Sequence, residues 1–586
     1  MRFISKKTGG YVVYAVAGVN TVSFAIDFTD ADTKGLLGFA VERHDLKNDE
    51  RYFMRGFKVF KDFLANPDEN TVVSTYENPV QSFVWDDFTG NPDNKYRYYF
   101  YPLKGKPKHI DRSAKPIEIA VQTEPLYDPI AKHDVFFNRG VASSQAYARK
   151  FSNETPDSIS DPGHKAAVLD WLARDLKTAL ITFIEQARKD DALYACFYEF
   201  HYLEVVSAFK AAIDRGVRVT IIIDAKKNKE QFPRADNLKT IQAAGIPAKH
   251  IIQREANPSS IQHNKFIVFA KGKSEVPAAV WTGSTNVSEG GLFGQTNVGH
   301  WVRDAQTARQ FKDYWDLLSG DPGGAPNDTR SEVLAKNKAF KQAVAAIEPD
   351  IPPDALATIP RSITPIFSPR PSDTMLHTYA ELLDSADDYA AITLAFGISD
   401  VFKQLLADNT AKDQITFMLL EKKDQPAPGQ TKKFTFLNAG NNVYEAFGSY
   451  IKDPLYQWTK EVNNQLLKLN QHVLYIHSKF LLADPLGEEP IVVTGSANFS
   501  TASTTANDEN MLIIKGNKRA ADIYFTEFNR LFNHYYFRSV YESHHAHAST
   551  TQDSLFLLPD DSWLSKYRPG SLRYKRVMIF RKIKEE

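Results

Sequence analysis

The sequence has one cysteine, Cys196, no long apolar run and no excess of charge of either sign. A single cysteine cannot form an intramolecular disulfide, so a disulfide scaffold is excluded, and its apolar neighbours predict a small buried side chain. No stretch approaches the roughly eighteen consecutive apolar residues that span a bilayer. Lys and Arg total 71, as do Asp and Glu. An anionic partner must therefore be held by a local patch and not by a global positive field.

The composition is that of an ordinary globular protein, with 43% apolar and 24% charged residues among 586. A chain of this length is too long for one hydrophobic core, so several domains are expected. The basic segment 1–7, followed by the apolar run Tyr11 to Val19, invites comparison with a signal peptide. The apolar core before Ala15 is too short for one, and a second apolar run over Thr21 to Phe28 predicts a hairpin. We therefore expect a cytoplasmic protein.

Residues 1–126 show short β-branched and aromatic runs separated by Gly, Asn, Asp and Pro, without a helical period. The predicted strands are Tyr11 to Val19, Thr21 to Phe28, Leu37 to Arg43, Ser82 to Trp85, Tyr96 to Pro102 and Ile117 to Gln122. This spacing predicts an all-β sandwich domain. The run Tyr96 to Pro102 weakly resembles a late strand of fibronectin type III or immunoglobulin-like modules.

An alternation of helices and strands begins after this region and then repeats. The first set is a helix at His164 to Arg188, a strand at Leu193 to Phe200, a helix at Glu204 to Arg215, a strand at Val217 to Asp224 and a helix at Asn237 to Ala244. The second is Asp373 to Ala386, Tyr389 to Ala395, Ser399 to Ala407 and Gln414 to Glu421. This order predicts α/β architecture, with a mixed sheet flanked by helices in each of two duplicated halves, 127–345 and 346–545. A basic C-terminal extension, 546–586, either packs on the core or forms a tail.

Each copy carries the same polar constellation. The first contains His263, Lys265, Gly283, Ser284 and Asn286, and the second contains His477, Lys479, Gly495, Ser496 and Asn498. His and Lys two residues apart at the start of a strand project from one face. Glycine permits close backbone approach, and Ser and Asn offer neutral donors to phosphate oxygens. Two such sets around one tetrahedral anion predict a phosphoryl-transfer site without a metal.

These residues resemble the phospholipase D superfamily, whose mark is His-Xaa-Lys, four residues and Asp, with Gly-Ser-Xaa-Asn downstream, twice per site. The resemblance covers roughly residues 140–545. The second copy fits completely, with Asp484 and the pair Glu509 and Asn510. The first copy has Ala270 where the family has Asp, and Thr296 is the position that we align with Glu509. Phosphodiesterases of the tyrosyl-DNA type also lack that Asp.

The resemblance implies a double displacement on a phosphodiester through a phosphohistidine, without a cofactor or metal ion. The implied catalytic residues are His263, His477, Lys265 and Lys479; the implied phosphate ligands are Ser284, Asn286, Ser496 and Asn498; and the implied supporting residues are Asp484, Glu509, Asn297 and Asn510. Family members with a duplicated motif commonly use the N-terminal histidine as nucleophile, which assigns attack to His263 and acid catalysis to His477. The complete second copy leaves the reverse assignment open.

The motif specifies a phosphodiester but not its substituents. We favour a nuclease, because Lys566 to Glu586 is basic and interleaved with Tyr567, Tyr574 and Phe580, and because a run of lysines, Lys226 to Lys229, follows a predicted strand. The alternative reading of the first segment is a solvated strand or tail, and that of the lysines is a solvated loop. A phospholipase D is the alternative function, and a phosphate-binding protein with decayed catalysis is a third. One chain carries both copies, so a monomer can form the site, and a homodimer is left open.

Three further segments are candidates for a functional role. The cluster His544, His545 and His547 lacks the ligand spacing of a metal site. Glu199 and His201 end a predicted strand, where they border the site or serve structural roles. Residues 422–451 have no counterpart that we could find in the first copy and suggest a lid or specificity loop.

Overall fold

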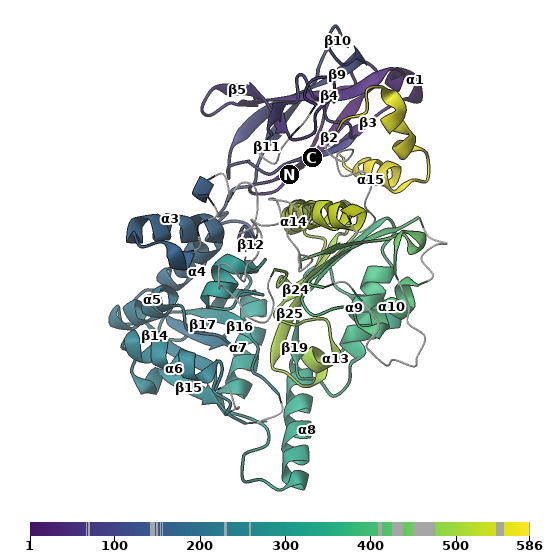
Figure 1. Ribbon diagram of the computed structural model, residues 1–586. Coiled ribbons are helices and arrows are strands. Elements are labelled where there is room, and N and C mark those ends of the chain that lie inside the picture. Colours follow the sequence, from purple (N-terminus) through teal and green to yellow (C-terminus); the bar gives the residue numbers. More distant parts are fainter. Residues whose placement is uncertain are drawn as a thin grey trace.

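The computed structural model describes the chain except for residues 66, 68–70, 141–146, 148–149, 153, 155, 228–230, 257–259, 408–412, 423, 425–436, 449–474, 546–555 and 585–586. A β-sandwich lies at the top of the molecule, a long helix lies beneath it, and two α/β halves stand side by side below (Figure 1). Among the described residues, the longest and most apolar helices fall short of what a bilayer crossing requires.

The N-terminal region is all-β, as predicted. One sheet has the order β1 (Arg2–Ile4), β2 (Val12–Ala17), β3 (Val22–Asp27) and β8 (Val84–Asp87). The other has the order β10 (His109–Asp111), β9 (Lys95–Lys106), β4 (Leu36–Asp45) and β5 (Glu50–Phe53), with β11 (Ile117–Gln122) also pairing β9. The short helix α1 (Asp30–Thr33) and the pair β6 (Arg55–Gly56) and β7 (Val73–Ser74) complete it.

The two sheets pack face to face through aromatic side chains. Phe24 of β3 meets Tyr98 and Phe100 of β9 at ring-centroid distances of 4.7 and 5.3 Å. The expected hairpin is formed by β2 and β3. Three consecutive strands, β1 to β3, are neighbours in one sheet, whereas in the immunoglobulin fold the third strand lies in the other sheet. The sandwich therefore departs from the immunoglobulin topology.

The first α/β half is a mixed sheet with the order β12 (His133–Phe137), β18 (Val298–Val302), β17 (Val276–Gly283), β16 (Lys265–Lys271), β13 (Ala192–Phe197), β14 (Arg218–Asp224) and β15 (Ile251–Arg254). The second has the order β19 (Ile363–Ser368), β25 (Glu509–Lys515), β24 (Ile491–Gly495), β23 (Phe480–Ala483), β20 (Tyr389–Leu394), β21 (Ile415–Leu420) and β22 (Val443–Phe447). Strand for strand the orders correspond, which confirms the duplication.

Helices cover these sheets. They are α3 (Pro162–Ala173), α4 (Leu176–Glu185), α5 (Leu203–Asp214), α6 (Arg234–Ala243), α7 (Ala305–Ser319) and α8 (Arg330–Ile347) in the first half, and α9 (Thr374–Asp384), α10 (Asp400–Leu406), α13 (Thr501–Thr505) and α14 (Lys518–His545) in the second. Short helical turns are η1 (Pro156–Ser158), η2 (Ala248–His250), η3 (Gly290–Gly294, a π-helix), η4 (Pro353–Thr358) and η6 (Ala439–Asn441). The boundary inferred near residue 345 coincides with the end of α8, and the domain limits themselves remain our proposal.

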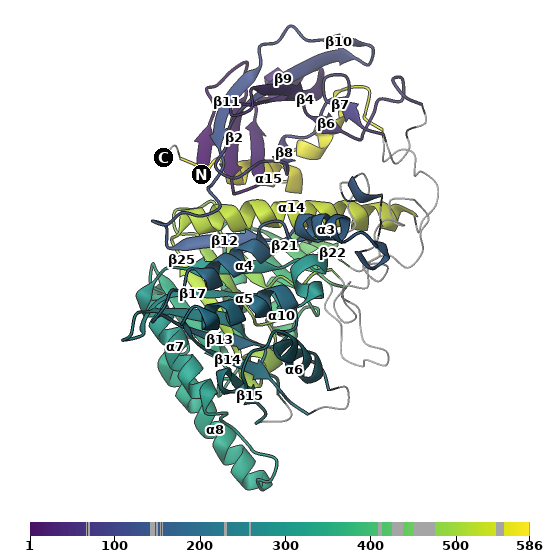
Figure 2. The same cartoon turned by 90° about the vertical axis from the view of Figure 1, so that its left-hand side faces the viewer.

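Helix α14 joins the layers, lying between the sandwich and the two sheets in both views (Figure 2). Its Asn529 donates a hydrogen bond to Ser23 of the sandwich at 3.2 Å. On its other side, the ring of Tyr524 lies 5.4 Å from Phe137 of the first half and 5.1 Å from Phe480 of the second. One hydrophobic core thus runs through all three layers.

The C-terminal extension folds back on the sandwich as η8 (Asp561–Tyr567) and α15 (Leu572–Phe580). The Trp563 indole donates to the Leu36 carbonyl at 2.9 Å, and Tyr567 and Phe580 are buried. These two aromatic rings are therefore core residues and are not available to stack on bases, and the segment is not a solvated strand or tail.

Two further expectations need correction. The single helix over His164 to Arg188 is two helices, broken at Arg174, whose φ is 50°. A residue that carries a Cβ rarely adopts such a positive φ, and a helix cannot continue through it. The end of the 422–451 segment does have a counterpart, because β22 occupies the sheet position of β15. Residues 423, 425–436 and 449–451 of that segment lie outside the described part.

Candidate active site

The predicted histidines and lysines lie where strands end, at one edge of each sheet. Because β16 runs antiparallel to β13, the start of β16 lies at the carboxyl edge of β13, where open α/β sheets bind ligands. His263 immediately precedes this start and Lys265 opens the strand. In the second half His477 and Lys479 have the same relation to β23. All four side chains are buried.

The two edges face each other and are joined by backbone pairing. Isolated bridges connect Gln262 with Asp508 and Thr296 with Ile476. The His263 amide donates to the Asp508 carbonyl at 2.9 Å, and the Thr296 amide donates to the Tyr475 carbonyl at 2.7 Å. Each histidine is thereby aligned by the other half, which brings both motifs into one site.

The two histidines have different partners. Nδ1 of His263 lies 2.9 and 3.0 Å from the two carboxylate oxygens of Glu509. Nδ1 of His477 lies 2.9 Å from Oδ1 of Asn297. Both acceptors place the ring proton on Nδ1 and leave Nε2 with its lone pair. One histidine is backed by a charge and the other by a neutral amide.

These contacts correct the alignment of the two copies. Asn297, not Thr296, is the counterpart of Glu509, because each follows its motif glycine, Gly283 or Gly495, by 14 residues. The first copy has two extra residues in the connection from His263 to that glycine, and pairing the downstream asparagines, Asn297 with Asn510, puts the alignment wrong by one residue. The Thr296 hydroxyl instead accepts a hydrogen bond from the His477 amide at 3.2 Å.

The motif serines do not present their hydroxyls to the site, contrary to expectation. Ser496 donates to Glu509 at 2.6 Å, and Ser284 donates to Asn297 at 2.8 Å. The same hydroxyls accept from the amides of Asn510 and Val298 at 3.0 and 3.1 Å. Both serines are thus occupied in holding the partners of the histidines.

The lysines are packed against the histidine backbone. Nζ of Lys265 donates to the His263 carbonyl at 2.5 Å, and Nζ of Lys479 donates to the His477 carbonyl at 2.7 Å. Burial lowers the pKa of Lys265 to about 8, although Glu509 opposes the shift. Burial, and then the neighbouring Lys265, lower the pKa of Lys479 well below its usual value. The two buried lysines are close enough for the charge of Lys265 to act on Lys479, an arrangement that a bound anion would stabilise.

The same crowding acts on the histidines. Burial lowers the pKa of His263, and the carboxylate of Glu509 partly offsets this effect. Burial also lowers the pKa of His477, whose Nδ1 faces the Asn297 amide in place of a carboxylate, and both lysines lower it further, so that it lies well below the usual value. Without substrate, both imidazoles are therefore neutral at neutral pH.

The motif asparagines retain unused hydrogen-bonding capacity. Asn286 donates from Nδ2 to Glu199 at 3.0 Å. The buried Oδ1 atoms of Asn286 and Asn498 lack a hydrogen-bond partner among the described residues. Glu199, one of the two border residues considered from the sequence, therefore contacts the site, whereas its companion His201 lies 3.7 Å from Glu199.

The sequence reasoning missed two aromatic residues, one beside His263 and one just after the end of β20. The ring of Tyr198 lies 5.1 Å from the ring of His263, and Nζ of Lys265 lies 5.5 Å from its centroid. Phe396 follows β20 by two residues, as Glu199 follows β13, and 68% of its surface is exposed. Both residues directly follow a strand that leads to the edge carrying His263 and His477, which we call the catalytic edge. This position was the available signal.

Asp484 lies at the other end of β23 from His477. Its carboxylate accepts hydrogen bonds from the amides of Asp387 and Asp388 at 2.7 and 2.9 Å, which closes the start of β20. In the first half the corresponding Ala270 cannot do this. Asp191, at the start of β13, instead accepts from the Gly272 amide beyond β16 at 2.8 Å. The motif Asp thus acts at the strand ends opposite the histidines. Its absence from the first copy does not change the catalytic edge.

Asn510 supports the join between the halves from behind the site. Its Nδ2 donates to Oδ1 of Asn264 at 2.8 Å, and its Oδ1 accepts from Thr282 at 2.5 Å.

Other segments singled out from the sequence lie apart from these contacts. Of the lysine run, Lys226 is buried beside Asp224 and Asp508, Lys227 is exposed, and 228–229 lie outside the described residues. The side chains of the His544 to His547 cluster also lie outside. Within the described residues, no group of three or more His, Cys, Asp or Glu side chains has the arrangement of a metal site.

Comparisons with known proteins place this geometry in a family. No curated protein matches the chain. Solved structures show weak likeness: a polyphosphate kinase from Porphyromonas gingivalis has a TM-score of 0.37 at 11% identity, over 58% of this chain and 43% of that one. Phosphatidylserine synthase of Haemophilus influenzae Rd KW20 has a TM-score of 0.42 at 12% identity, over 70% of this chain and 93% of that one. A yeast tyrosyl-DNA phosphodiesterase mutant has a TM-score of 0.31 at 11% identity, over 66% and 91%.

A family model gives the stronger result. The model described as "Cardiolipin synthase, PLD-like domain" matches residues 180–318 and 379–532. The first segment falls in one α/β half and the second in the other, and each contains one histidine and lysine pair. Because the two segments together make up half of the sequence, the chain belongs to the phospholipase-D-like family.

Proposed function

We propose that the protein is a phosphodiesterase that works through a phosphohistidine on His263, needs no metal ion and hydrolyses nucleic acid. The observation that carries the proposal is the unequal pairing of the histidines, His263 with Glu509 and His477 with Asn297. A phosphorylated imidazole carries positive charge, which a carboxylate at Nδ1 stabilises and a neutral amide does not. This asymmetry selects His263 as the nucleophile.

In the first step Nε2 of His263 attacks phosphorus, and the bond from phosphorus to the leaving oxygen breaks. His477 gives its Nε2 proton to that oxygen. In the second step His477 takes a proton from water, the water oxygen bonds to phosphorus, and the bond to His263 breaks. Protons and bonds balance over the two steps, and both histidines return to their starting states.

Lys265 and Lys479 stabilise the charge on the non-bridging oxygens, because they are the buried cations nearest the two histidines. Asn286 and Asn498 assist as neutral ligands, as rotation of an amide presents either its oxygen or its nitrogen. Ser284, Ser496, Asn297 and Glu509 are positioning residues in this scheme.

Substrate binding also explains how His477 becomes protonated. The lysines lower its pKa in the empty site, and the negative charge of a phosphodiester offsets them. The pKa of His477 therefore rises when substrate binds, which supplies the acid for the first step only when there is a phosphate to cleave.

Nucleic acid is the proposed substrate because the catalytic edge combines buried cations with the exposed ring of Phe396. Such a pairing of phosphate-binding charge and a stacking surface suits single-stranded nucleic acid. The phospholipid alternative is favoured by the description of the family model, which names a lipid synthase. A cytoplasmic location stays an expectation from the sequence. One chain supplies both motifs, so the proposal requires no dimer.

The experiment is hydrolysis in EDTA of single-stranded DNA, double-stranded DNA and phosphatidylcholine vesicles by the wild type and by His263→Ala and His477→Ala. The exposed His109 of β10 provides a matched control, His109→Ala. The proposal expects DNA cleavage that both site variants lose and the control keeps. Cleavage of lipid alone would move the protein to the phospholipases, and no cleavage would favour a phosphate-binding protein with decayed catalysis.

A further inference from the structure

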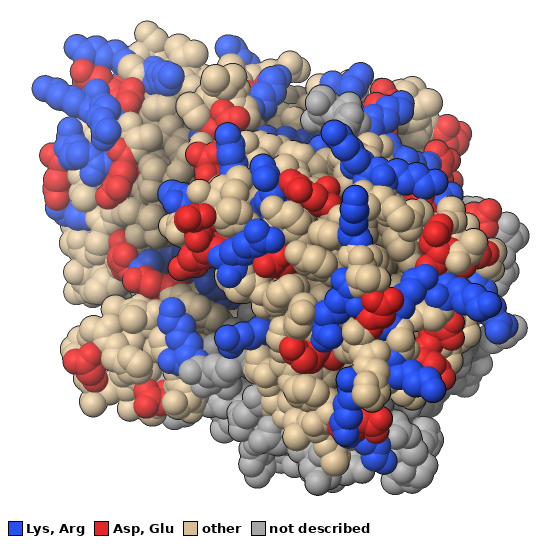
Figure 3. Space-filling view, turned by 90° about the horizontal axis from the view of Figure 1, so that it is seen from above, with Lys and Arg blue, Asp and Glu red and all other residues tan. Residues whose placement is uncertain are grey.

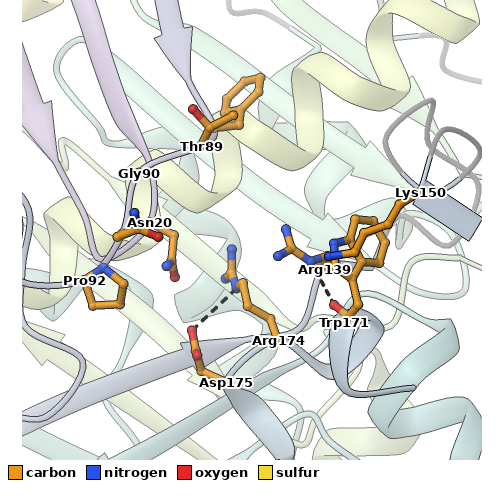
Figure 4. Close-up of a pocket in the computed structure, with 11 residues that line it drawn as sticks. Asn20, Thr89, Gly90, Pro92, Arg139, Lys150, Trp171, Arg174 and Asp175 are labelled. Carbon is orange, nitrogen blue, oxygen red and sulfur yellow. Dashed lines mark hydrogen bonds and ion pairs between the residues drawn. The ribbon is translucent and has the colours of Figure 1, made fainter. Parts of the chain in front are cut away.

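A second charged cavity lies away from the catalytic edge, where the sandwich meets the first half. It has a volume of about 670 Å³ and is lined by Asn20 and residues 88–92 of the sandwich and by Arg139, Lys150, Trp171, Arg174 and Asp175 of the first half. Figure 4 shows the three cationic side chains and the ring of Trp171 around it. A cavity of this size suits a small molecule.

The cavity carries an excess of positive charge. Behind it, Glu527 of α14 pairs with Arg174 at 3.1 Å and with Arg530 at 2.8 Å. Asp175, the acid in the lining, lies 3.9 Å from Arg174. These two carboxylates face four cations: Arg139, Lys150, Arg174 and Arg530.

Of these four cations, Arg139 and Lys150 form no ion pair with a carboxylate among the described residues. Arg139 is the more buried of the two, and its Nε donates to the Trp171 carbonyl at 2.8 Å. Its guanidinium carbon lies 4.3 Å from the centre of the Trp171 ring, which fixes the side chain in place. Burial, with Arg174 and Arg530 nearby, lowers its pKa to about 10. A fixed, desolvated and unpaired guanidinium is a ready site for an anion.

We propose that this cavity binds a small organic phosphate monoester, with the phosphate held by Arg139, Lys150 and Arg174. A guanidinium donates two parallel hydrogen bonds to phosphate oxygens, which a lone ammonium cannot do. Phe88, Pro92 and Trp171 supply apolar surface for the organic part. The inference does not depend on the proposed catalytic function.

The cavity is linked to the active site through the backbone. Arg530 donates to the carbonyls of Arg139 and Asn138 at 2.6 and 3.1 Å. Oδ1 of Asn138 accepts from the Asn297 amide at 2.9 Å, and Asn297 in turn holds His477. A ligand that contacts Arg139 therefore touches the chain segment that orients a catalytic residue.

The test is calorimetric titration of phenyl phosphate and of inorganic phosphate into the full-length Lys265→Met/Lys479→Met protein, in which phosphate binding at the catalytic edge is suppressed. We expect one phenyl phosphate per chain, bound at least as tightly as inorganic phosphate. Adding Arg139→Gln should weaken binding at least tenfold. Arg188→Gln, which changes an exposed arginine beyond α4, is the matched control and should leave the affinity unchanged.

A loss of affinity through misfolding is separated by Asp175→Asn. This variant removes the acid from the lining and should tighten phenyl phosphate binding several-fold, an effect that a damaged fold would not produce. The proposal fails if the double variant binds no phenyl phosphate, if Arg139→Gln binds as well as its parent, or if Asp175→Asn weakens binding.

Discussion

Glu509, from the second half of the molecule, holds the imidazole of His263, from the first, with both carboxylate oxygens within 3.0 Å of Nδ1. The reciprocal position is filled by Asn297, which holds His477. Pseudo-symmetry brings the two histidines together, and they differ in their partners, an acid for His263 and an amide for His477. The duplicated fold thus gives two chemically different imidazoles.

Replacing Glu509 by Gln should lower kcat by about 10² to 10⁴-fold, the range expected when the partner of a catalytic histidine loses its charge. The variant keeps a hydrogen-bond acceptor, so binding of substrate should change little. Because the carboxylate raises the pKa of His263, its loss lowers that pKa, and the acid limb of the kcat/KM profile moves to lower pH. An unchanged kcat would exclude His263 as the nucleophile.

Asn297→Asp should shift the basic limb of the kcat/KM profile, whereas Glu509→Gln shifts the acid limb. A carboxylate beside Nδ1 favours the protonated imidazole, so the pKa of His477 rises from its depressed value. The general acid then keeps its proton to higher pH, and the basic limb of the kcat/KM profile moves upward. The profile over pH 5 to 9 measures this, with Asn327→Asp, an exposed position in the loop before α8, as a control. A downward shift of the basic limb would contradict the assignment of His477 as the acid.

Much of this architecture could be predicted from the sequence, because its signals are local. Strands such as β14 are β-branched runs, and the two motifs sit directly on strand starts, so the duplicated α/β halves and the set of site residues follow from short patterns. The histidines, lysines and motif asparagines all fall at the catalytic edge.

The missing parts depend on contacts between distant segments. That Glu509 faces His263 and not His477 follows from how the halves meet, which the spacing within one half does not reveal. The one-residue misalignment arose because Asn297 and Asn510 share a residue type, whereas the position of Asn297 in the sheet is that of Glu509. The burial of Tyr567 depends on the fold-back of the C-terminal segment onto the sandwich, where acidic and basic side chains are intermixed (Figure 3).

Asp484→Ala should cost stability and spare catalysis. The carboxylate accepts three amides at the start of β20, with donors at 2.7 to 3.2 Å, and leaving them unpaired costs about 1 to 3 kcal/mol. We expect a lower Tm in thermal unfolding with kcat essentially unchanged. Ala270→Asp, the reverse change in the first half, should not raise kcat. A large loss of kcat in Asp484→Ala at temperatures well below its Tm would show that the motif Asp acts on the chemistry.

His477→Ala should trap the covalent intermediate when the leaving group needs no proton. With bis(4-nitrophenyl) phosphate we expect a burst of about one nitrophenolate per chain and slow turnover, since the first step proceeds without acid but water is no longer activated. Mass spectrometry of the acid-sensitive adduct should locate it on His263. His263→Ala should give no burst. An adduct on His477 in the His263→Ala variant would show that the two histidines have the reverse roles.

Phe396→Ala tests how the substrate is held. The ring is exposed and follows β20 at the position that Glu199 takes after β13. A base stacked on an aromatic side chain contributes about 1 to 3 kcal/mol. For a single-stranded oligonucleotide we therefore expect KM to rise roughly 5- to 150-fold while kcat stays nearly constant. Bis(4-nitrophenyl) phosphate has no base to stack, so its kcat/KM should change much less. Phe396→Tyr keeps a stacking face and should restore the oligonucleotide KM. Equal losses on both substrates would mean that Phe396 supports the site itself and does not select nucleic acid.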